Sequence, residues 1–584
     1  MIAQAIVSAF STFLADPGGL LPPDAMSDDP GNEAWGGARS GGFLNDAVLP
    51  ADPARAAIIA VIDDAIPFAH EMLRAGDHSR VAAIWAQDAR PGPGGDLPFG
   101  REWRGQGIDR LLAQLRNGSL PDEDSLYRAA GVLDYGRGLR PSAGYAGGHG
   151  AAVAMLAAGF APDDTAGRDH PVIGVSLPSK LTEDSMGVSA PPYILAAILF
   201  VVLRARQLCR FTEERHGLAS GTVRMPLVIN ISYGLTAGPR DGSSLLEQFM
   251  DALSRSGPRD LGPIRFVLPM GNHRQAMLCG RLRRGQELTW RLQPGDHTDS
   301  AVEIWGPRLP EPPTRPFVLH LAAPGQPPAP TTFTADGQIS ILRDSAEAEI
   351  ARAYYIVQRS GDGRTWREGI VLIAMPTSPD KPGHPWAPPG DWQISIDPQA
   401  PNGIYEISVQ RDEAVPGYPR EARQSALICP HYRIFDDVDR MLPDDPPRSR
   451  SRVRRRHTLN TYAGGAETLR AGAVQLRPAT SRDGAGAGSI YSGLLTCGRN
   501  GDIQAVTDRS GTVSGIAVAG RDSGSVRITA GTSLAAPQLA RWLAGQMAAG
   551  FCPATRDGVI THAAAGTPLA EVPVLPYQPK FPEY

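Results

Sequence analysis

The segment TAGTSLAAPQLAR, residues 529–541, is the most informative stretch of the chain for its fold. Small and apolar residues follow Gly531 and Thr532 in a pattern typical of a helix, and Pro537 lies where we expect its first turn, which tolerates proline best. Ser533 therefore stands at a predicted helix N-terminus, where its hydroxyl meets the positive end of the helix dipole and unpaired backbone N–H groups. Serine is also a very common N-cap, so the position alone does not establish chemistry.

The chain around this segment alternates short apolar runs with helical stretches. The runs typical of buried strands are AAIIAVID (56–63), PLVINISYG (226–234) and IRFVLPMGN (264–272). The helical stretches are HGAAVAMLAAG (149–159), YILAAILFVVLRARQLCRF (193–211) and SSLLEQFMDALSRSG (243–257). Strands and helices in alternation predict an α/β fold with a mostly parallel sheet covered by helices on both faces.

The pattern changes near residue 281. At least six short strand-like runs follow without an intervening helix: ELTWRLQ (287–293), FVLHL (317–321), YYIVQ (354–358), GIVLIAM (369–375), WQISI (392–396) and YEISVQ (405–410). They predict an inserted β-sandwich at 281–430. The expected organisation is an N-terminal arm or short leader (1–55), an α/β domain in two parts (56–280 and 458–552), the insertion, a charged connector (431–457) that we expect to be exposed, and an extended C-terminal tail (553–584).

Composition excludes several classes of protein. Hydrophobic residues make up 42% of the 584 and charged residues 20%, as in globular proteins, and the net charge of −4 gives no basic field for nucleic acid. The five cysteines are widely spaced and indicate neither a disulfide framework nor a zinc site. The longest apolar run, 194–203, is about half of a membrane span, and the N-terminus lacks the basic start of a signal peptide. We therefore expect a cytoplasmic protein without a membrane span.

Three further motifs accompany Ser533. Asp63 ends a buried strand, which places it at the carboxyl edge of a parallel sheet, the usual location of function in open α/β folds. His149 follows two glycines and opens a helix, and Asn272 ends a strand in a Gly-Asn turn. Each has an ordinary structural explanation by itself: a helix cap, a structural histidine and a turn residue. Their order along the chain, Asp, His, Asn and Ser, gives them joint weight.

Taken together, the set resembles the subtilisin-like serine proteases (subtilases, peptidase family S8). That family has V-I-D at a strand end, H-G-T-H-V-A-G, A-G-N and G-T-S-M-A-A-P, and this chain has VID at 61–63, HGAAVA at 149–154, GN at 271–272 and GTSLAAP at 531–537. The order Asp, His, Ser is that of subtilisin and differs from that of chymotrypsin and the α/β-hydrolases. The resemblance covers about 56–275 and 458–550. Departures such as Ala65 for glycine and Ala152 for the second histidine remove no triad group.

The resemblance implies a serine endopeptidase of subtilisin-like fold. Ser533 would be the nucleophile, His149 the general base and Asp63 the residue that orients it, while Asn272 would complete the oxyanion hole. We expect Asp63 rather than Asp64 in this role because strand alternation would point their side chains to opposite faces. A peptide or protein substrate would pair with the segment that contains VINISYG. The residues expected to contact that substrate are Ser232, Tyr233, Gly234, Met270 and Gly271. No metal or cofactor is expected.

An alternative belongs to another class of protein: a binding or regulatory protein with this fold, whose triad is held inactive until a partner engages. The intact set of four residues favours the enzyme, since a scaffold has no physical need for all of them. The insertion begins just after Asn272, so it either shapes substrate access and docks an activating or inhibiting partner, or serves only stability. A hydrolase with the Gly-x-Ser-x-Gly elbow is disfavoured because the sequence around Ser533 lacks the second glycine.

Overall fold

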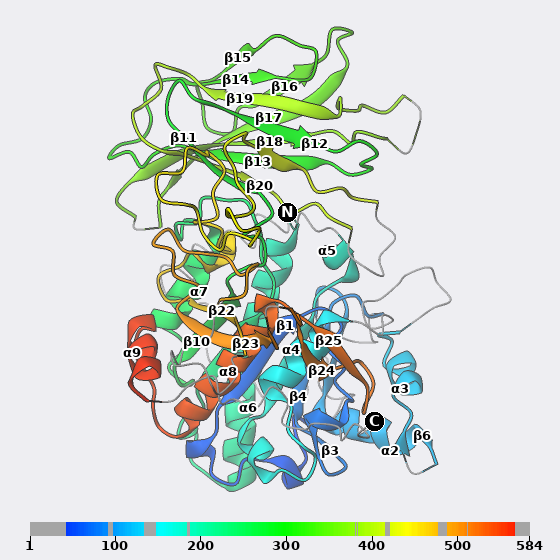
Figure 1. Ribbon diagram of the computed structural model, residues 1–584. Helices are drawn as coiled ribbons and strands as arrows, with labels where there is room; N and C mark the ends of the chain where they lie inside the picture. The colour runs from blue at the N-terminus through cyan, green and yellow to red at the C-terminus, as the bar shows by residue number, and fades with distance from the viewer. Residues whose placement is uncertain are drawn as a thin grey trace.

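The computed structural model describes residues 42–566, apart from 91–96, 119, 134–147, 184–186, 188, 362, 380, 382, 415–420, 477–487 and 511. Within this part, an eight-stranded sheet forms the centre of an α/β unit (Figure 1). Its strands lie in the order β23 (Ile503–Asp508), β22 (Leu469–Gln475), β10 (Ile264–Pro269), β9 (Leu227–Ile231), β1 (Ile58–Asp63), β8 (Val172–Ser176), β4 (Val81–Ala86) and β5 (Arg101–Arg104). All neighbours are parallel except β4 and β5. The predicted mostly parallel α/β sheet is confirmed.

Helices cover both faces of this sheet. Every residue of the central strand β1 is therefore buried, as is typical of a parallel sheet. Ile58, Ala60 and Ile62 pack into a core with α6 (Ala190–His216) and α7 (Leu245–Arg255). Ile59 and Val61 face the opposite core. The helices of that second core are α4 (His149–Ala158), α8 (Thr532–Ala548), α2 (Gly105–Gln114), α3 (Glu123–Ala129) and α9 (Arg556–Gly566). The helices α4 and α8, which begin with the HG and GTS motifs, therefore lie on the same face.

Smaller elements surround this unit. They are the strand pairs β2 (Arg74–Ala75) with β3 (His78–Ser79), β6 (Arg116–Asn117) with β7 (Leu120–Pro121), and β24 (Ile516–Ala519) with β25 (Val526–Thr529), and the short helix α5 (Ser179–Glu183). Among the described residues, no helix combines the length and the apolar character that crossing a membrane requires.

Two antiparallel sheets lie at the top of Figure 1, away from the parallel sheet. The first contains β11 (Cys279–Leu282), β20 (Tyr405–Val409), β13 (Ser300–Trp305), β18 (Trp366–Ala374), β17 (Glu349–Arg359) and β16 (Ile339–Arg343). The second contains β15 (Ala329–Phe333), β14 (Phe317–Ala322), β19 (Gly390–Ile396), β12 (Glu287–Leu292) and β21 (Ala426–Ile428). Both contribute to one core, with Trp290 and Trp392 from the second sheet and Ile304 and Leu372 from the first. The alternation of buried and exposed residues along β12 matches the pattern of its sequence.

Both ends of the described chain contain more structure than the sequence suggested. The segment 42–55 lies within the expected arm, yet Phe43 and Leu44 are buried in the core with α6. The expected extended tail contains helix α9, which is held by the fully buried Val559. The predictions of an arm and of an extended tail failed in these segments because their few apolar residues form part of a core only once the sheet that they cover has assembled. The remainder of the arm and of the tail lies outside the described residues.

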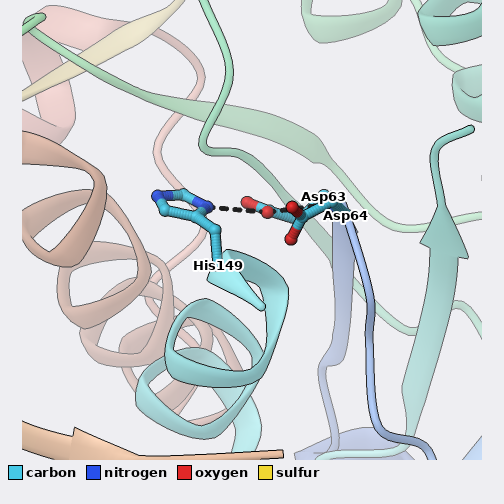
Figure 2. Close-up of side chains that lie close together, drawn as sticks. All are labelled: Asp63, Asp64 and His149. Atoms are coloured by element: carbon cyan, nitrogen blue, oxygen red, sulfur yellow. Dashed lines mark hydrogen bonds and ion pairs between the residues drawn. The ribbon is translucent and has the colours of Figure 1, made fainter. Parts of the chain in front are cut away.

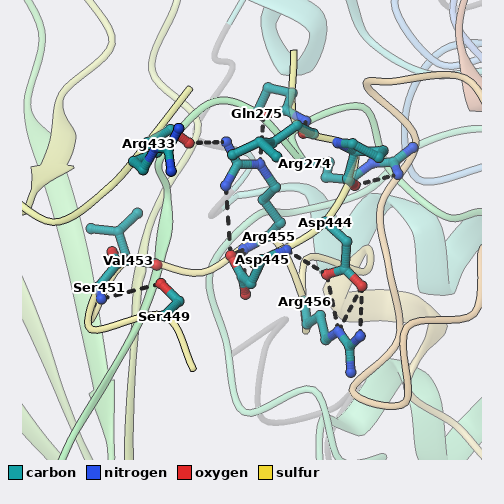
Figure 3. Close-up of polar contacts among 12 residues, drawn as sticks. Arg274, Gln275, Arg433, Asp444, Asp445, Ser449, Ser451, Val453, Arg455 and Arg456 are labelled. Atoms are coloured by element: carbon teal, nitrogen blue, oxygen red, sulfur yellow. Dashed lines mark hydrogen bonds and ion pairs between the residues drawn. The ribbon is translucent and has the colours of Figure 1, made fainter. Parts of the chain in front are cut away.

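The charged connector, 431–457, is largely exposed along 431–450, as expected, but it is anchored near its C-terminal end, where Ser451, Val453 and Arg455 are buried (Figure 3). The Arg455 side chain is buried and donates from Nη2 to the Arg433 carbonyl at 2.6 Å. The Arg456 guanidinium forms an ion pair with Asp444 at 2.6 Å. Arg455 and Arg456, at the end of the basic run, are thus held by the local backbone and by an acidic residue of the same connector.

Candidate active site

Asp63 and His149 form the best-defined polar contact at the carboxyl edge of the parallel sheet (Figure 2). Asp63 is the last residue of β1 and is buried, whereas His149 is the first residue of α4. The His149 Nδ1 atom lies 2.7 Å from Asp63 Oδ1, and 40% of the histidine side chain is exposed. A buried carboxylate therefore holds an imidazole that remains accessible from outside.

The expectation that Asp64 would point to the opposite face is wrong. Its Oδ1 accepts a hydrogen bond of 2.7 Å from the Gly150 N–H, so it caps the same helix that carries His149. Alternation does not reach Asp64 because β1 ends one residue earlier. The chain then turns through Ala65 at φ +38°, a conformation that glycine adopts more readily. The Asp64 N–H donates to Asp63 Oδ1 at 2.8 Å, so the turn also steadies the carboxylate beside the histidine.

The electrostatics of this cluster follow from burial and crowded acids. Burial, and next the neighbouring Asp63 carboxylate, raise the pKa of Asp64 to about 6. Burial opposes the charged form of His149, but the carboxylate and hydrogen bond of Asp63 outweigh it, so the pKa of His149 is raised above its ordinary value. Arg527 lies at the N-terminus of α4, where its Nη2 donates to the Gly148 carbonyl at 3.1 Å. Its positive charge acts against both upward shifts.

The same three side chains bring one ligand atom each to within 4.8 Å of one another, a spacing that a metal ion would accept. The hydrogen bonds argue against that use. Asp63 Oδ1 already accepts from His149 and from the Asp64 N–H, and Asp64 Oδ1 accepts from Gly150. A metal held by either of these Oδ1 atoms would have to displace a donor, whereas Asp63 Oδ2 has no hydrogen-bond partner among the described residues. The expectation of a site without metal stays our prediction.

Gly150 is required at its position because α4 starts in contact with the turn after β1. A Cβ atom there would lie 1.5 Å from the Asp64 carbonyl oxygen. We expect Gly150→Ala to lower the free energy of unfolding by about 1–3 kcal/mol, as overpacking does, and to displace His149. Gly545→Ala in α8 is the matched control, because a Cβ there meets nothing within 4 Å. That variant should gain up to about 1 kcal/mol in denaturant unfolding. Equal stability of the two variants would contradict the prediction.

Ser533 is the second residue of α8 and is partly exposed. Its backbone carbonyl accepts a hydrogen bond of 3.1 Å from Ser232 Oγ. This contact explains Pro537, which is the sixth residue of α8 and so lies beyond the first turn where we predicted it. Proline has no N–H for the carbonyl four residues earlier, and that carbonyl is the one of Ser533. Ser232 supplies the missing donor.

The structure places Ser533 and His149 at the N-termini of two helices that pack together, α8 and α4. Among the described residues, no hydrogen bond joins their side chains. In a ligand-free protein, catalytic hydrogen bonds are often long, and they shorten when substrate binds.

Asn272 follows β10 and is tied to the residue before Ser533. Its Oδ1 atom accepts from the Thr532 N–H and from Thr532 Oγ1, both at 2.8 Å. The Gly271 N–H donates to the same hydroxyl at 3.0 Å. With its oxygen fixed in this way, the amide of Asn272 retains Nδ2 as the donor beside the start of α8. Sequence reasoning missed Thr532, which links the GN and GTS motifs.

The expected substrate segment is partly occupied. Ser232 Oγ is used by Ser533, and the Tyr233 carbonyl accepts from Asn460 Nδ2 at 3.1 Å. The backbone N–H of Asn460 donates to the Met270 carbonyl at 2.7 Å. Pairing of a substrate along 232–234 therefore stays a prediction, in which the Tyr233 carbonyl already accepts one hydrogen bond and has a second lone pair for the substrate. Nothing in the sequence near Asn460 marked it as part of the site.

The inserted sheets contact the edge of this region. Gln410, which follows β20, accepts on Oε1 from the N–H groups of Thr236 and Ala237 at 3.1 and 3.3 Å. Glu413, three residues further on, lies 4.0 Å from the imidazole of His273, the neighbour of Asn272. The insertion thus contacts the chain just after both expected substrate-binding segments.

Comparisons with known proteins support the fold. No protein-family model matches the chain, and no curated protein matches it. A solved structure described as that of the Clostridium perfringens CspB protease aligns with a TM-score of 0.52 and 13% identity, over 85% of this chain and 83% of that chain. At this identity the likeness establishes the arrangement of the chain, and that arrangement is shared with a protease.

Proposed function

We propose that this chain is a serine endopeptidase that hydrolyses peptide bonds through Asp63, His149 and Ser533. The observation that carries the proposal is the buried Asp63 carboxylate on Nδ1 of the partly exposed His149, on the face where α8 presents Ser533. An imidazole fixed at Nδ1 by a carboxylate keeps Nε2 as the basic atom, which is the arrangement a serine nucleophile needs. The fold shared with a protease agrees with it.

The mechanism assigns one step to each group. His149 Nε2 takes the proton of Ser533 Oγ as that oxygen attacks the substrate carbonyl and forms the C–O bond. The resulting oxyanion is stabilised by Asn272 Nδ2 and the Ser533 N–H, and Asp63 stabilises the imidazolium. His149 then gives its proton to the leaving amine as the C–N bond breaks. Water then attacks the acyl carbon as His149 takes its proton, and His149 gives that proton to Ser533 Oγ as the ester C–O bond breaks.

The histidine must be neutral to act as base, so activity should follow its titration. Because the pKa of His149 is raised above 6.5, we expect kcat/KM to rise with pH through a midpoint above that value. The Asp64 carboxylate contributes to this upward shift, so Asp64→Asn should move the midpoint to lower pH. Profiles of kcat/KM from about pH 5 to 9 for both proteins test this. A midpoint that stays fixed or rises in the variant would contradict the electrostatic account.

The proposal is tested by digesting a library of unfolded peptides and mapping the new termini by mass spectrometry. We expect internal cleavages that are absent with Ser533→Ala prepared in parallel. Cleavage by both proteins would point to a contaminant. Cleavage by neither, with both folded, would favour the binding or regulatory alternative.

The contacts at the end of β20 support a role of the insertion in substrate access. Gln410 holds the chain beyond the expected substrate segment, and Glu413 approaches the neighbour of the oxyanion residue. We propose that a folded substrate or a protein partner would meet the insertion before it reaches Ser533.

A further inference from the structure

Asn460 bridges the two segments between which the proposed enzyme would hold its substrate. Its Nδ2 donates to the Tyr233 carbonyl at 3.1 Å, beyond the end of β9, and to the Pro269 carbonyl at 3.2 Å, at the end of β10. The residue is 3% exposed. These neighbouring strands end side by side, so the Asn460 side chain fills the gap where the two chains separate.

The amide also lies directly against Gly234. A Cβ atom on Gly234 would lie 2.1–2.3 Å from the three terminal atoms of the Asn460 side chain. Glycine is therefore needed at 234 to admit the asparagine. The Asn460 side chain thus takes up the space that a side chain at position 234 would need.

Asn460 is held firmly in this place. Its Oδ1 accepts from the Tyr462 N–H at 3.1 Å and caps a short 3-10 helix, η8 (Thr461–Ala463). The next residue, Thr461, donates from its N–H to the Leu235 carbonyl and from Oγ1 to the Ala237 carbonyl. Both ends of the amide are hydrogen-bonded, so a substrate side chain would have to break several bonds to displace it.

This position determines which substrate group meets Asn460. The attacked carbonyl must lie near Asn272 Nδ2 and Ser533. A peptide paired along 232–234, the expected substrate segment, would place the side chain of the same residue beside that segment, where Asn460 lies against Gly234 and Tyr233. Since Asn460 fills this space, we propose that it determines specificity and restricts the residue on the carbonyl side of the cleaved bond to Gly, Ala or Ser. The inference rests on the proposed function.

The test uses peptidyl diphenyl phosphonates that differ only in carrying the side chain of Ala, Leu or Phe at the reacting residue. Attack by Ser533 forms an O–P bond and releases phenol, so the rate of phenol release reports the fit of each side chain. We expect the wild-type protein to react with the Ala compound about a hundredfold faster than with the Phe compound. Asn460→Ser retains a capping oxygen for the Tyr462 N–H and removes the amide. In this variant the rate advantage of the Ala compound over the Phe compound should fall about tenfold or more.

Equal or faster reaction of the wild-type protein with the Phe compound would overturn the inference, and that comparison needs no variant. An unchanged ratio in a folded Asn460→Ser protein would also overturn it. An alkyl fluorophosphonate, which carries no amino-acid side chain, separates the two levels. If this probe labels Ser533 of the wild-type protein but the phosphonates show no preference for Ala, only the proposed specificity is rejected. If the probe does not label the folded protein, the proposed function is rejected and the inference with it.

Discussion

Ser533→Ala is expected to lower peptide turnover by on the order of a millionfold. The loss should be this large because no other group can form the acyl intermediate, and the members of a triad act as a unit. Ser533 is partly exposed at the start of α8, and no hydrogen bond of its side chain supports the fold in the described residues. The thermal unfolding midpoint should therefore change little.

Initial rates on a cleaved library peptide, measured at high enzyme concentration, test this expectation. Ser340→Ala, on strand β16 of the antiparallel sheets, is the matched control and should retain wild-type turnover. If Ser533→Ala kept more than about a hundredth of the activity, another nucleophile would have to be sought.

Asp63→Asn is expected to lower kcat by about ten-thousandfold. The amide would accept a proton poorly and offer its NH₂ to Nδ1, which favours the wrong tautomer of His149. Asp64→Asn is an unusually close control. Its side chain is also buried, and the oxygen of an asparagine can still accept from the Gly150 N–H. We expect that variant to lose no more than about tenfold at a pH above the His149 midpoint.

The comparison of these two variants tests which carboxylate orients the histidine. Both should be assayed at equal, verified folding, with kcat measured at saturating substrate. Similar losses in Asp63→Asn and Asp64→Asn would mean that the carboxylates act jointly. A larger loss in Asp64→Asn would contradict the assignment made from the 2.7 Å contact.

The sequence was most informative where one local pattern determined one element. The largely apolar runs that became β1, β9 and β10 predicted a sheet buried on both faces, and a helix does begin at the GTS motif. It was least informative where a segment is held by distant partners. Helix α9 and the buried Phe43 depend on cores that only the assembled sheet creates.

At the candidate site, too, local patterns could be predicted and contacts between distant segments could not. Asp63 and His149 could be named because each stands at an element boundary with a distinctive motif, and the structure brings them into contact. The role of Asp64 as a cap could not be read, since it depends on a strand that ends one residue early. Asn460 lies 188 residues beyond Asn272 in the chain, and its hydrogen bonds to Tyr233 and Pro269 arise only from tertiary folding.

The central claim is that Ser533 is a nucleophile activated by His149. The most direct measurement is labelling of the purified protein with a fluorophosphonate at neutral pH, followed by mass spectrometric mapping of the modified residue. The account predicts a single adduct on Ser533 that forms far more slowly in His149→Ala. A folded wild-type protein that takes up no probe, or takes it up on another residue, would contradict it.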